Sequence, residues 1–298
     1  MRTSIPQILW CPDLRKYDVE IHTSYEALFR GDPKPPFTRS EGEYPIQIEL
    51  TLYVDGVPYS RPLEDKVVVR KNGDVGIQSF SVNLNQLYEG EDFLQDRPEI
   101  EGSGYLRCVL KGRDEDLNPL PEVPFWLHAQ KRNCLFIYPA SLMFGNPKAS
   151  PHGLRSRFCE QFPAVVYEPD EDVTTALALI NPQNRETRTA VRMFPPDLDG
   201  EKTEFKLKLP PHSAKLLPLH ECFALERRKR NSGILVISDH KQVTFSVHMD
   251  LAGKNVWSVD HTDPWRTRHF SGVPFSLYIR RKLARALGKV GMFNYHGH

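Results

Sequence analysis

The sequence has 298 residues, which is long enough for about two domains, each with a core of its own. Lysine and arginine number 39 and aspartate and glutamate 38, and the formal net charge of +1 excludes a chain drawn to nucleic acid or to an anionic membrane by its overall field. The 25 prolines outnumber the 18 glycines, and no stretch approaches about 18 unbroken apolar residues. We therefore expect many short elements joined by turns, and no transmembrane segment.

The N-terminus and the cysteines favour a cytoplasmic protein. The first residues contain no continuous apolar segment of the kind that a cleaved export signal requires. The cysteines are odd in number, widely separated and never paired as Cys-x-x-Cys, which favours reduced thiols over a disulfide framework or a zinc ribbon. They are Cys11, Cys108, Cys134, Cys159 and Cys222.

Short segments separated by turns fill the first half of the chain. In residues 46–52, isoleucine or leucine alternates with polar or aromatic residues, as in a strand with one face on a core. Asp55 and Gly56 follow as a two-residue hairpin turn, and residues 67–69 and 79–84 supply further strands. This spacing indicates a β-sandwich or a small barrel.

The second half repeats this order of elements. A nearly continuous apolar strand is expected at 176–180, followed by a strand at 190–194, a hairpin turn at 199–200, and strands at 205–209 and 214–219.

Both halves also end alike. In the first, an apolar strand at 104–110 precedes Phe-Trp-Leu-His at 125–128, and in the second a strand at 233–237 precedes Phe-Ser-Val-His at 245–248. Self-similarity in a fixed order of elements indicates duplication of one unit. We therefore expect an all-β protein of two tandem antiparallel β-sandwich domains related by duplication, residues 1–145 and 146–275, followed by a helix and tail at 276–298.

Residues 276–290 give the one clear helical pattern. Its apolar side chains recur at helical spacing, at Ile279, Leu283, Ala286, Leu287 and Val290. Its other face is basic, with Arg280, Arg281, Lys282, Arg285 and Lys289. Because an isolated helix of this length is marginal in water, we expect it to dock on the second domain or on a neighbouring subunit.

His128 and His248 occupy equivalent places in the two Phe-x-x-His segments. The strand period of two puts Phe125 and Phe245 on a core face and both histidines on the opposite face. The histidines are then either catalytic or binding groups of a shared pocket, or structural groups that hydrogen-bond to neighbouring strands. We favour the structural interpretation, because neither histidine has a catalytic companion in the sequence.

Two His-x-Asp tripeptides, His248 with Asp250 and His261 with Asp263, have the two-ligand spacing of a 2-His-1-carboxylate iron site. A third ligand would come from His269, His296 or His298. The tripeptide is common by chance and no arginine is placed for a 2-oxoacid, so we interpret these residues as turn acids and surface imidazoles and expect no metal.

Motifs for other chemistry are missing from the sequence. It contains no Gly-x-Ser-x-Gly nucleophile turn, no Gly-x-x-x-x-Gly-Lys-Ser/Thr loop and no Gly-x-Gly-x-x-Gly fingerprint. We therefore expect no standard nucleotide site and no cofactor.

Basic clusters are the remaining candidates for binding. One contains Arg227, Arg228 and Arg230, and the other groups C-terminal arginines with aromatic residues: Arg280, Arg281, Arg285 and Trp265. Such clusters bind phosphorylated or acidic protein partners, nucleic acid or anionic surfaces, or they simply solvate a loop and a helix face.

Together these patterns predict a non-enzymatic cytoplasmic binding or assembly module that associates with itself or with a protein partner. The alternative is an enzyme with a histidine-lined pocket at the domain interface, such as a metal-dependent oxygenase. It would use His128 and His248, and His261 with Asp263.

Overall fold

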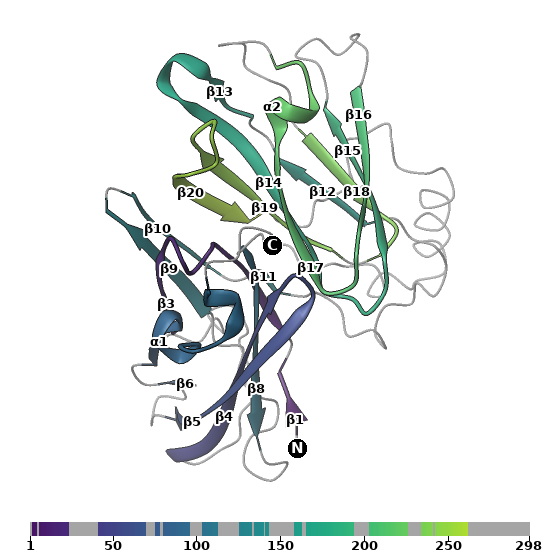
Figure 1. Cartoon of the computed structure of the whole chain (residues 1–298). Helices are drawn as coiled ribbons and strands as arrows, with labels where there is room; N and C mark the ends of the chain where they lie inside the picture. Colours follow the sequence, from purple (N-terminus) through teal and green to yellow (C-terminus); the bar gives the residue numbers. More distant parts are fainter. Residues whose placement is uncertain are drawn as a thin grey trace, which may run out of the picture.

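The computed structural model describes residues 2–4, 6–23, 41–69, 75–77, 80–95, 103–112, 125–132, 134–139, 141–142, 158–162, 165–193, 203–225, 234–240 and 242–261. These residues form several antiparallel sheets with only short helices, so the expected all-β class is confirmed (Figure 1). In the described part of the chain, no helix has the length and apolar character needed to cross a membrane.

The described residues of the first half form two antiparallel sheets. Its elements are β1 (Arg2–Thr3), β2 (Gln7–Cys11), β3 (Asp18–Thr23), β4 (Gly42–Val54), β5 (Val57–Val69), β6 (Val75–Ile77), β7 (Ser81–Asn83), α1 (Leu84–Leu87), η1 (Asp92–Leu94), β8 (Gly104–Gly112), β9 (Phe125–Lys131), β10 (Cys134–Pro139) and β11 (Ser141–Leu142). Sheet 1 has the order β11-β2-β8-β4-β5-β6, with β1 also paired to β8, and sheet 2 has the order β10-β9-β3-β7.

The described residues of the second half form two further antiparallel sheets. Its elements are β12 (Phe158–Phe162), β13 (Tyr167–Glu168), η2 (Pro169–Glu171), β14 (Val173–Asn181), β15 (Thr187–Met193), β16 (Thr203–Leu209), β17 (Ser213–Pro218), α2 (Leu219–Cys222), β18 (Ile234–Ser238), β19 (Val243–Met249) and β20 (Val256–His261). Sheet 3 has the order β12-β18-β15-β16, and sheet 4 has the order β13-β14-β19-β20, with β17 also paired to β14.

The strand orders of the two halves correspond. Across sheet 3 the strand order β12-β18-β15-β16 matches β2-β8-β4-β5 of sheet 1, when strands are equated by their succession along each half. Across sheet 4 the order β20-β19-β14-β17 matches β10-β9-β3-β7 of sheet 2 in the same way. The two Phe-x-x-His segments lie in β9 and β19, which therefore hold the same place in their sheets.

The hairpin of β4 and β5 follows the sequence closely. Ile46, Ile48 and Leu50 are buried while the residues between them are less so. Asp55 and Gly56 have φ of 48° and 82°, the positive values that a two-residue hairpin turn needs, and Val54 pairs with Val57 across it. The expected strand and turn are confirmed.

Two strands end earlier than the sequence pattern predicts, because a one-turn helix follows each. β7 ends at Asn83, whose side chain accepts a hydrogen bond from the backbone nitrogen of Gln86 at 3.0 Å and so caps α1. β17 ends at Pro218, and α2 follows it. The helices replace the last expected strand residues, Leu84 and Leu219.

One hydrophobic core of the described residues extends over both halves of the chain. The buried residues of sheets 1 and 2 continue into one face of sheet 4. The ring of Phe245 in β19 packs edge-on against that of Tyr138 in β10, with centroids 5.4 Å apart. A second core lies between sheets 3 and 4 and contains Leu177, Val191 and Val236.

Sheet 4 is covered on both faces, and this explains the composition of β14. Ala176 and Ala178 contribute to the core shared with the first half, while Leu177 and Leu179 contribute to the second core. All four side chains are fully buried. A strand buried on both sides needs apolar residues at every position, and the sequence has them at 176–180.

Candidate protein-binding face

Three of the four large apolar side chains that are exposed in the described residues lie on two strands. Leu135 and Ile137 of β10 are 58% and 53% exposed, and Trp257 of β20 is 44% exposed; the fourth is Val57 of β5, at 50%. Among the described strands, β10 and β20 lie at the edges of sheets 2 and 4, close to each other where the two halves meet (Figure 1). We call the surface formed by Leu135, Ile137 and Trp257 the β10–β20 face.

The exposed side chains of β10 and β20 lie next to residues of the shared core. Phe136 and Tyr138 of β10 alternate with the exposed residues and pack in the shared core. Val256 and Val259 of β20 pack in that same core. By the strand period, Leu135 and Ile137 lie on the side of sheet 2 away from the core. Trp257 lies at an irregularity in the pairing of β19 with β20, where Met249 is opposite Val256 and His248 is opposite Ser258, and its side chain is exposed there.

Polar side chains border the β10–β20 face. His128 of β9 is directly opposite Ile137, and Glu20 of β3 is directly opposite His128. On the other side, His248 of β19 is directly opposite Ser258 of β20. An apolar centre with a polar rim is the usual anatomy of a protein interface.

The hydroxyl of Tyr17 holds β20 against the first half. It accepts a hydrogen bond from the backbone nitrogen of Val256 at 3.0 Å and donates one to the carbonyl of Lys254 at 3.2 Å. The same carbonyl accepts a hydrogen bond from the Lys131 ammonium at 2.9 Å. Burial raises the pKa of Tyr17 despite the hydrogen bond from Val256, so the hydroxyl keeps the proton that it donates.

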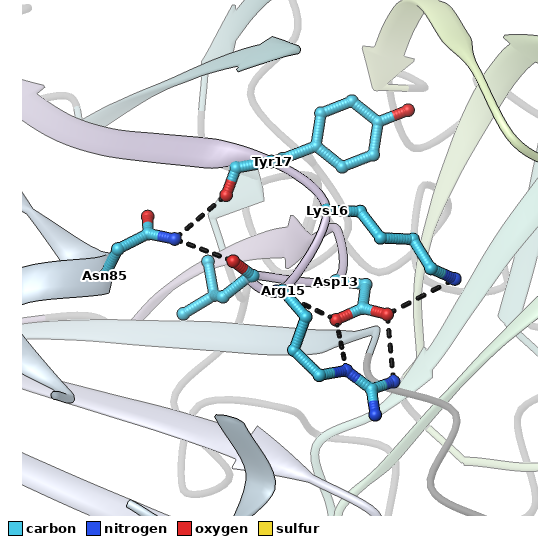
Figure 2. A network of polar contacts seen from close by, with 6 residues as sticks. Asp13, Arg15, Lys16, Tyr17 and Asn85 are labelled. Carbon is cyan, nitrogen blue, oxygen red and sulfur yellow. Dashed lines mark hydrogen bonds and ion pairs between the residues drawn. The ribbon is translucent and has the colours of Figure 1, made fainter. Parts of the chain in front are cut away.

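Asn85 fixes the turn that carries Tyr17. Figure 2 shows its side-chain nitrogen donating to the carbonyls of Leu14 and Tyr17, at 2.7 and 2.9 Å. Its side-chain oxygen accepts a hydrogen bond from the backbone nitrogen of Val19 at 2.9 Å. One amide from α1 therefore satisfies two backbone carbonyls of the turn between β2 and β3 and one backbone N–H at the start of β3.

An ion pair closes the same turn. Figure 2 shows the carboxylate of Asp13 between Arg15 and Lys16; the Arg15 guanidinium donates to both carboxylate oxygens at 2.9 Å. Burial acts to raise the pKa of Asp13, but the hydrogen bonds and charge of Arg15, aided by Lys16, lower it overall. The ionised carboxylate therefore stabilises the turn.

Asp250, a weak metal candidate, organises the turn between β19 and β20. Its two carboxylate oxygens accept hydrogen bonds from the backbone nitrogen of Lys254 at 2.6 Å and from the side chain of Asn255 at 2.7 Å. This arrangement agrees with the interpretation of Asp250 as a turn acid.

His128 lies beside a second histidine. Its ring is 6.5 Å from that of His22, and its Nδ1 is 3.9 Å from the carboxylate of Glu20. Its Nε2 is buried and has no hydrogen-bond partner in the structure. Burial lowers the pKa of His22, and His128 adds to this, while Glu20 acts in the opposite direction.

His248 has different partners. Its Nδ1 lies 3.0 Å from the hydroxyl of Ser258, and burial lowers its pKa against the opposing effect of Asp260. The described contacts of His128 and His248 are thus with their own sheets. The two histidines border the β10–β20 face from opposite sides. A functional role for either of them stays a prediction.

No metal centre forms among the described residues. No group of three or more His, Cys, Asp or Glu side chains comes together there in a way that could hold an ion. His261 is the last residue of β20 and pairs with Phe245. Asp263 and the proposed third ligands lie outside the described residues.

A groove of about 410 Å³ lies where the turn at Asp55 and Gly56 meets the second half. Its other lining residues are Lys208, Leu209, Pro210, Pro211, Ser213, Ala214 and Lys215. Beside it, the ring of His212 stacks on Tyr53 at 5.2 Å. His128 and His248 are not among the lining residues, so the expected histidine-lined pocket stays a prediction.

The basic clusters and the C-terminal helix fall outside the described residues. This applies to Arg227, Arg228, Arg230, Trp265, Arg280, Arg281 and Arg285, and to the whole segment 276–298. Their roles stay predictions.

Sequence reasoning did not single out the β10–β20 face or Tyr17. The signal for the face was present in the run Cys134-Leu135-Phe136-Ile137, because a strand at the edge of a sheet with one solvated face should alternate. An unbroken apolar run there implies apolar side chains on the outer face. Tyr17 stands in a polar turn and gave no such signal.

Comparisons with known proteins leave the function open. No protein-family model matches the chain, and no curated protein matches it. Among solved structures, a β-glucuronidase from Bacteroides uniformis aligns with 90% of this chain and 26% of its own, at 11% identity and a TM-score of 0.17. The chain thus spans about a quarter of that enzyme, and the likeness is too weak to support an argument about fold or function.

Proposed function

We propose that this protein is a non-enzymatic binding or assembly module and that the β10–β20 face is its docking surface for a protein. The observation that carries the proposal is the exposure of Leu135, Ile137 and Trp257 together on two adjacent edge strands. Single exposed apolar residues are ordinary, whereas a contiguous apolar patch with a polar rim marks an interaction site.

The chemistry of the rim favours a protein as the partner. The described surroundings of the face carry the Glu20 and Asp260 carboxylates together with the cations Lys131, Arg132 and Lys254, and charges of both signs suit a protein better than a polyanion. Nucleic acid or an anionic surface would be bound only through the basic clusters at 227–230 and 280–285.

The architecture that presents the face is, in our proposal, two tandem β-sandwiches at 1–145 and 146–275, derived by duplication. The matching strand orders and the one-turn helices after β7 and β17 support this origin. The free thiols of Cys11, Cys108 and Cys134, all buried, favour the cytoplasm.

A pair of lysine substitutions tests the proposed function. Ile137→Lys places a charge in the β10–β20 face, while Val57→Lys makes the same change at a similarly exposed position in β5. We expect sedimentation analysis or affinity capture from the source cells to show an association that the wild type and Val57→Lys retain and Ile137→Lys loses. An association that survives Ile137→Lys, or a chain that stays monomeric and captures nothing, would refute the docking surface.

A further inference from the structure

We infer that the protein bound at the β10–β20 face presents a basic amphipathic helix, with apolar side chains over β10 and lysine or arginine side chains over β3. The inference rests on the proposed function and specifies the chemistry of the partner. It follows from two parallel rows of side chains on the outer face of sheet 2, the face turned away from the shared core. Each row runs from an exposed apolar residue to a carboxylate.

The strand register defines the two rows, and each row takes one residue from β10, one from β9 and one from β3. The rows are Ile137, His128 and Glu20, and next to them Leu135, Gln130 and Asp18. All six side chains lie on the outer face, because the residues that alternate with them are buried in the shared core. Neighbouring strands are about 4.8 Å apart, so each acidic residue lies about 10 Å from the apolar residue of its row.

Neutral groups are the hydrogen-bond donors to the two carboxylates. The Ser81 hydroxyl of β7 donates to Glu20, and the Asn83 side chain donates to Asp18 at 2.6 Å. Within the described part of the chain, neither carboxylate forms an ion pair with a lysine or an arginine; the Nδ1 of His128 lies 3.9 Å from Glu20. Two carboxylates side by side on β3 therefore offer opposite charge to a cation of the partner.

The nearby cations lie elsewhere. Lys131 directs its ammonium to the Lys254 carbonyl at 2.9 Å and lies 5.5 Å from the centre of the Tyr17 ring, so it is on the core side of sheet 2. Arg132 and Lys254 belong to the turns that follow β9 and β19. The charges around the face are thus segregated, and the side toward β3 is acidic.

A helix that crosses the strands of sheet 2 fits the spacing of the rows. Positions seven residues apart lie on the same helix face and are separated by about 10.5 Å along the axis. An apolar residue at one such position and a basic residue at the other therefore meet both ends of a row. Apolar contact then anchors the helix, and the charges set its direction.

Two synthetic amphipathic helical peptides test the inference, with binding to the full-length chain measured by fluorescence anisotropy. The peptides have the same leucines, and at the positions seven residues further on one carries lysine and the other glutamate. We expect the lysine peptide to bind about fivefold more tightly or better at physiological salt, and high salt to reduce this preference.

Isosteric substitutions separate the carboxylates from the apolar residues. Asp18→Asn combined with Glu20→Gln should bring the two peptides to nearly equal affinity. Glu64→Gln in β5 is the control, because the Glu64 carboxylate is also exposed and accepts a hydrogen bond from an amide, that of Gln47 at 3.0 Å. It should leave the preference unchanged.

A further variant distinguishes this inference from the proposed function. Ile137→Ser leaves the charges in place and should weaken both peptides alike. Equal binding of the two peptides, binding of neither, or a lysine preference that survives the loss of both carboxylates would overturn the inference. If Ile137→Ser still weakens binding in such a case, the docking surface stands without its basic partner. Binding that Ile137→Ser leaves unchanged would remove the docking surface and the inference with it.

Discussion

The hydroxyl of Tyr17 and the backbone nitrogen of Val256 are 3.0 Å apart, and their hydrogen bond joins the first half of the chain to β20 of the second. A turn held by Asn85 and by the pair of Asp13 and Arg15 positions the hydroxyl. The shared core and this bond together fix β20 close to β10, and thereby form the β10–β20 face.

Removal of the Tyr17 hydroxyl should destabilise the whole protein. Tyr17→Phe leaves the Val256 N–H and the Lys254 carbonyl without this partner, and we expect the free energy of unfolding in urea to fall by about 1–3 kcal/mol. Tyr59→Phe is the matched control, because the Tyr59 hydroxyl donates to the Asp92 carboxylate at an exposed site, at 2.8 Å. Equal losses from the two variants would contradict a specific role for Tyr17.

The Asp13 carboxylate should make stability depend on acid. Its pKa is lowered in the folded chain, so its contribution is complete above the unfolded value of about 3.9 and is lost as the pH falls through the folded value. Asp13→Asn should therefore cost stability at pH 6 and flatten the decline between pH 5 and 2. Parallel unfolding curves of wild type and variant across that range would argue against this role.

The histidines should make the free energy of unfolding depend on pH nearer to neutrality. The pKa of His248 and that of His22 are lowered in the folded chain, so the unfolded chain binds protons first as the pH falls below about 6.5. Stability present at pH 7.5 should then decline toward pH 5.5. His248→Gln should reduce this slope in urea unfolding, and an unchanged slope would show that His248 titrates alike in both states.

Phe245 should couple the two halves. Phe245→Ala removes a ring that packs against Tyr138 and should cost about 3–5 kcal/mol. Hydrogen exchange should then accelerate in β9 and β10 as well as in β19. Val191→Ala, in the second core, should affect sheets 3 and 4 first. If Phe245→Ala left exchange in the first half unchanged, the core would not be cooperative.

Local patterns predicted the local structure well. The alternation at 46–52 and the Asp55-Gly56 turn specify β4 and its hairpin, because strand period and turn geometry are short-range properties. The same period correctly put Phe125 and Phe245 on a core face.

Those local patterns do not predict how sheets that are distant in the sequence pack against one another. A period of two shows which side chains share a face of β19 but does not identify the sheet that covers it, so the joining of both halves in one core could not be foreseen. The bond between Tyr17 and Val256 spans 239 positions and leaves no local trace in the sequence. The β10–β20 face depends on that arrangement, and only the apolar run at 134–137 indicated it.

The most direct test of the central proposal is hydroxyl-radical footprinting of the full-length chain with and without its captured protein partner. The account predicts that the partner protects Leu135, Ile137 and Trp257 from oxidation, while Val57, which is similarly exposed, stays unchanged. Protection at the groove around Lys208 and Lys215, with Trp257 oxidised equally in both samples, would contradict it.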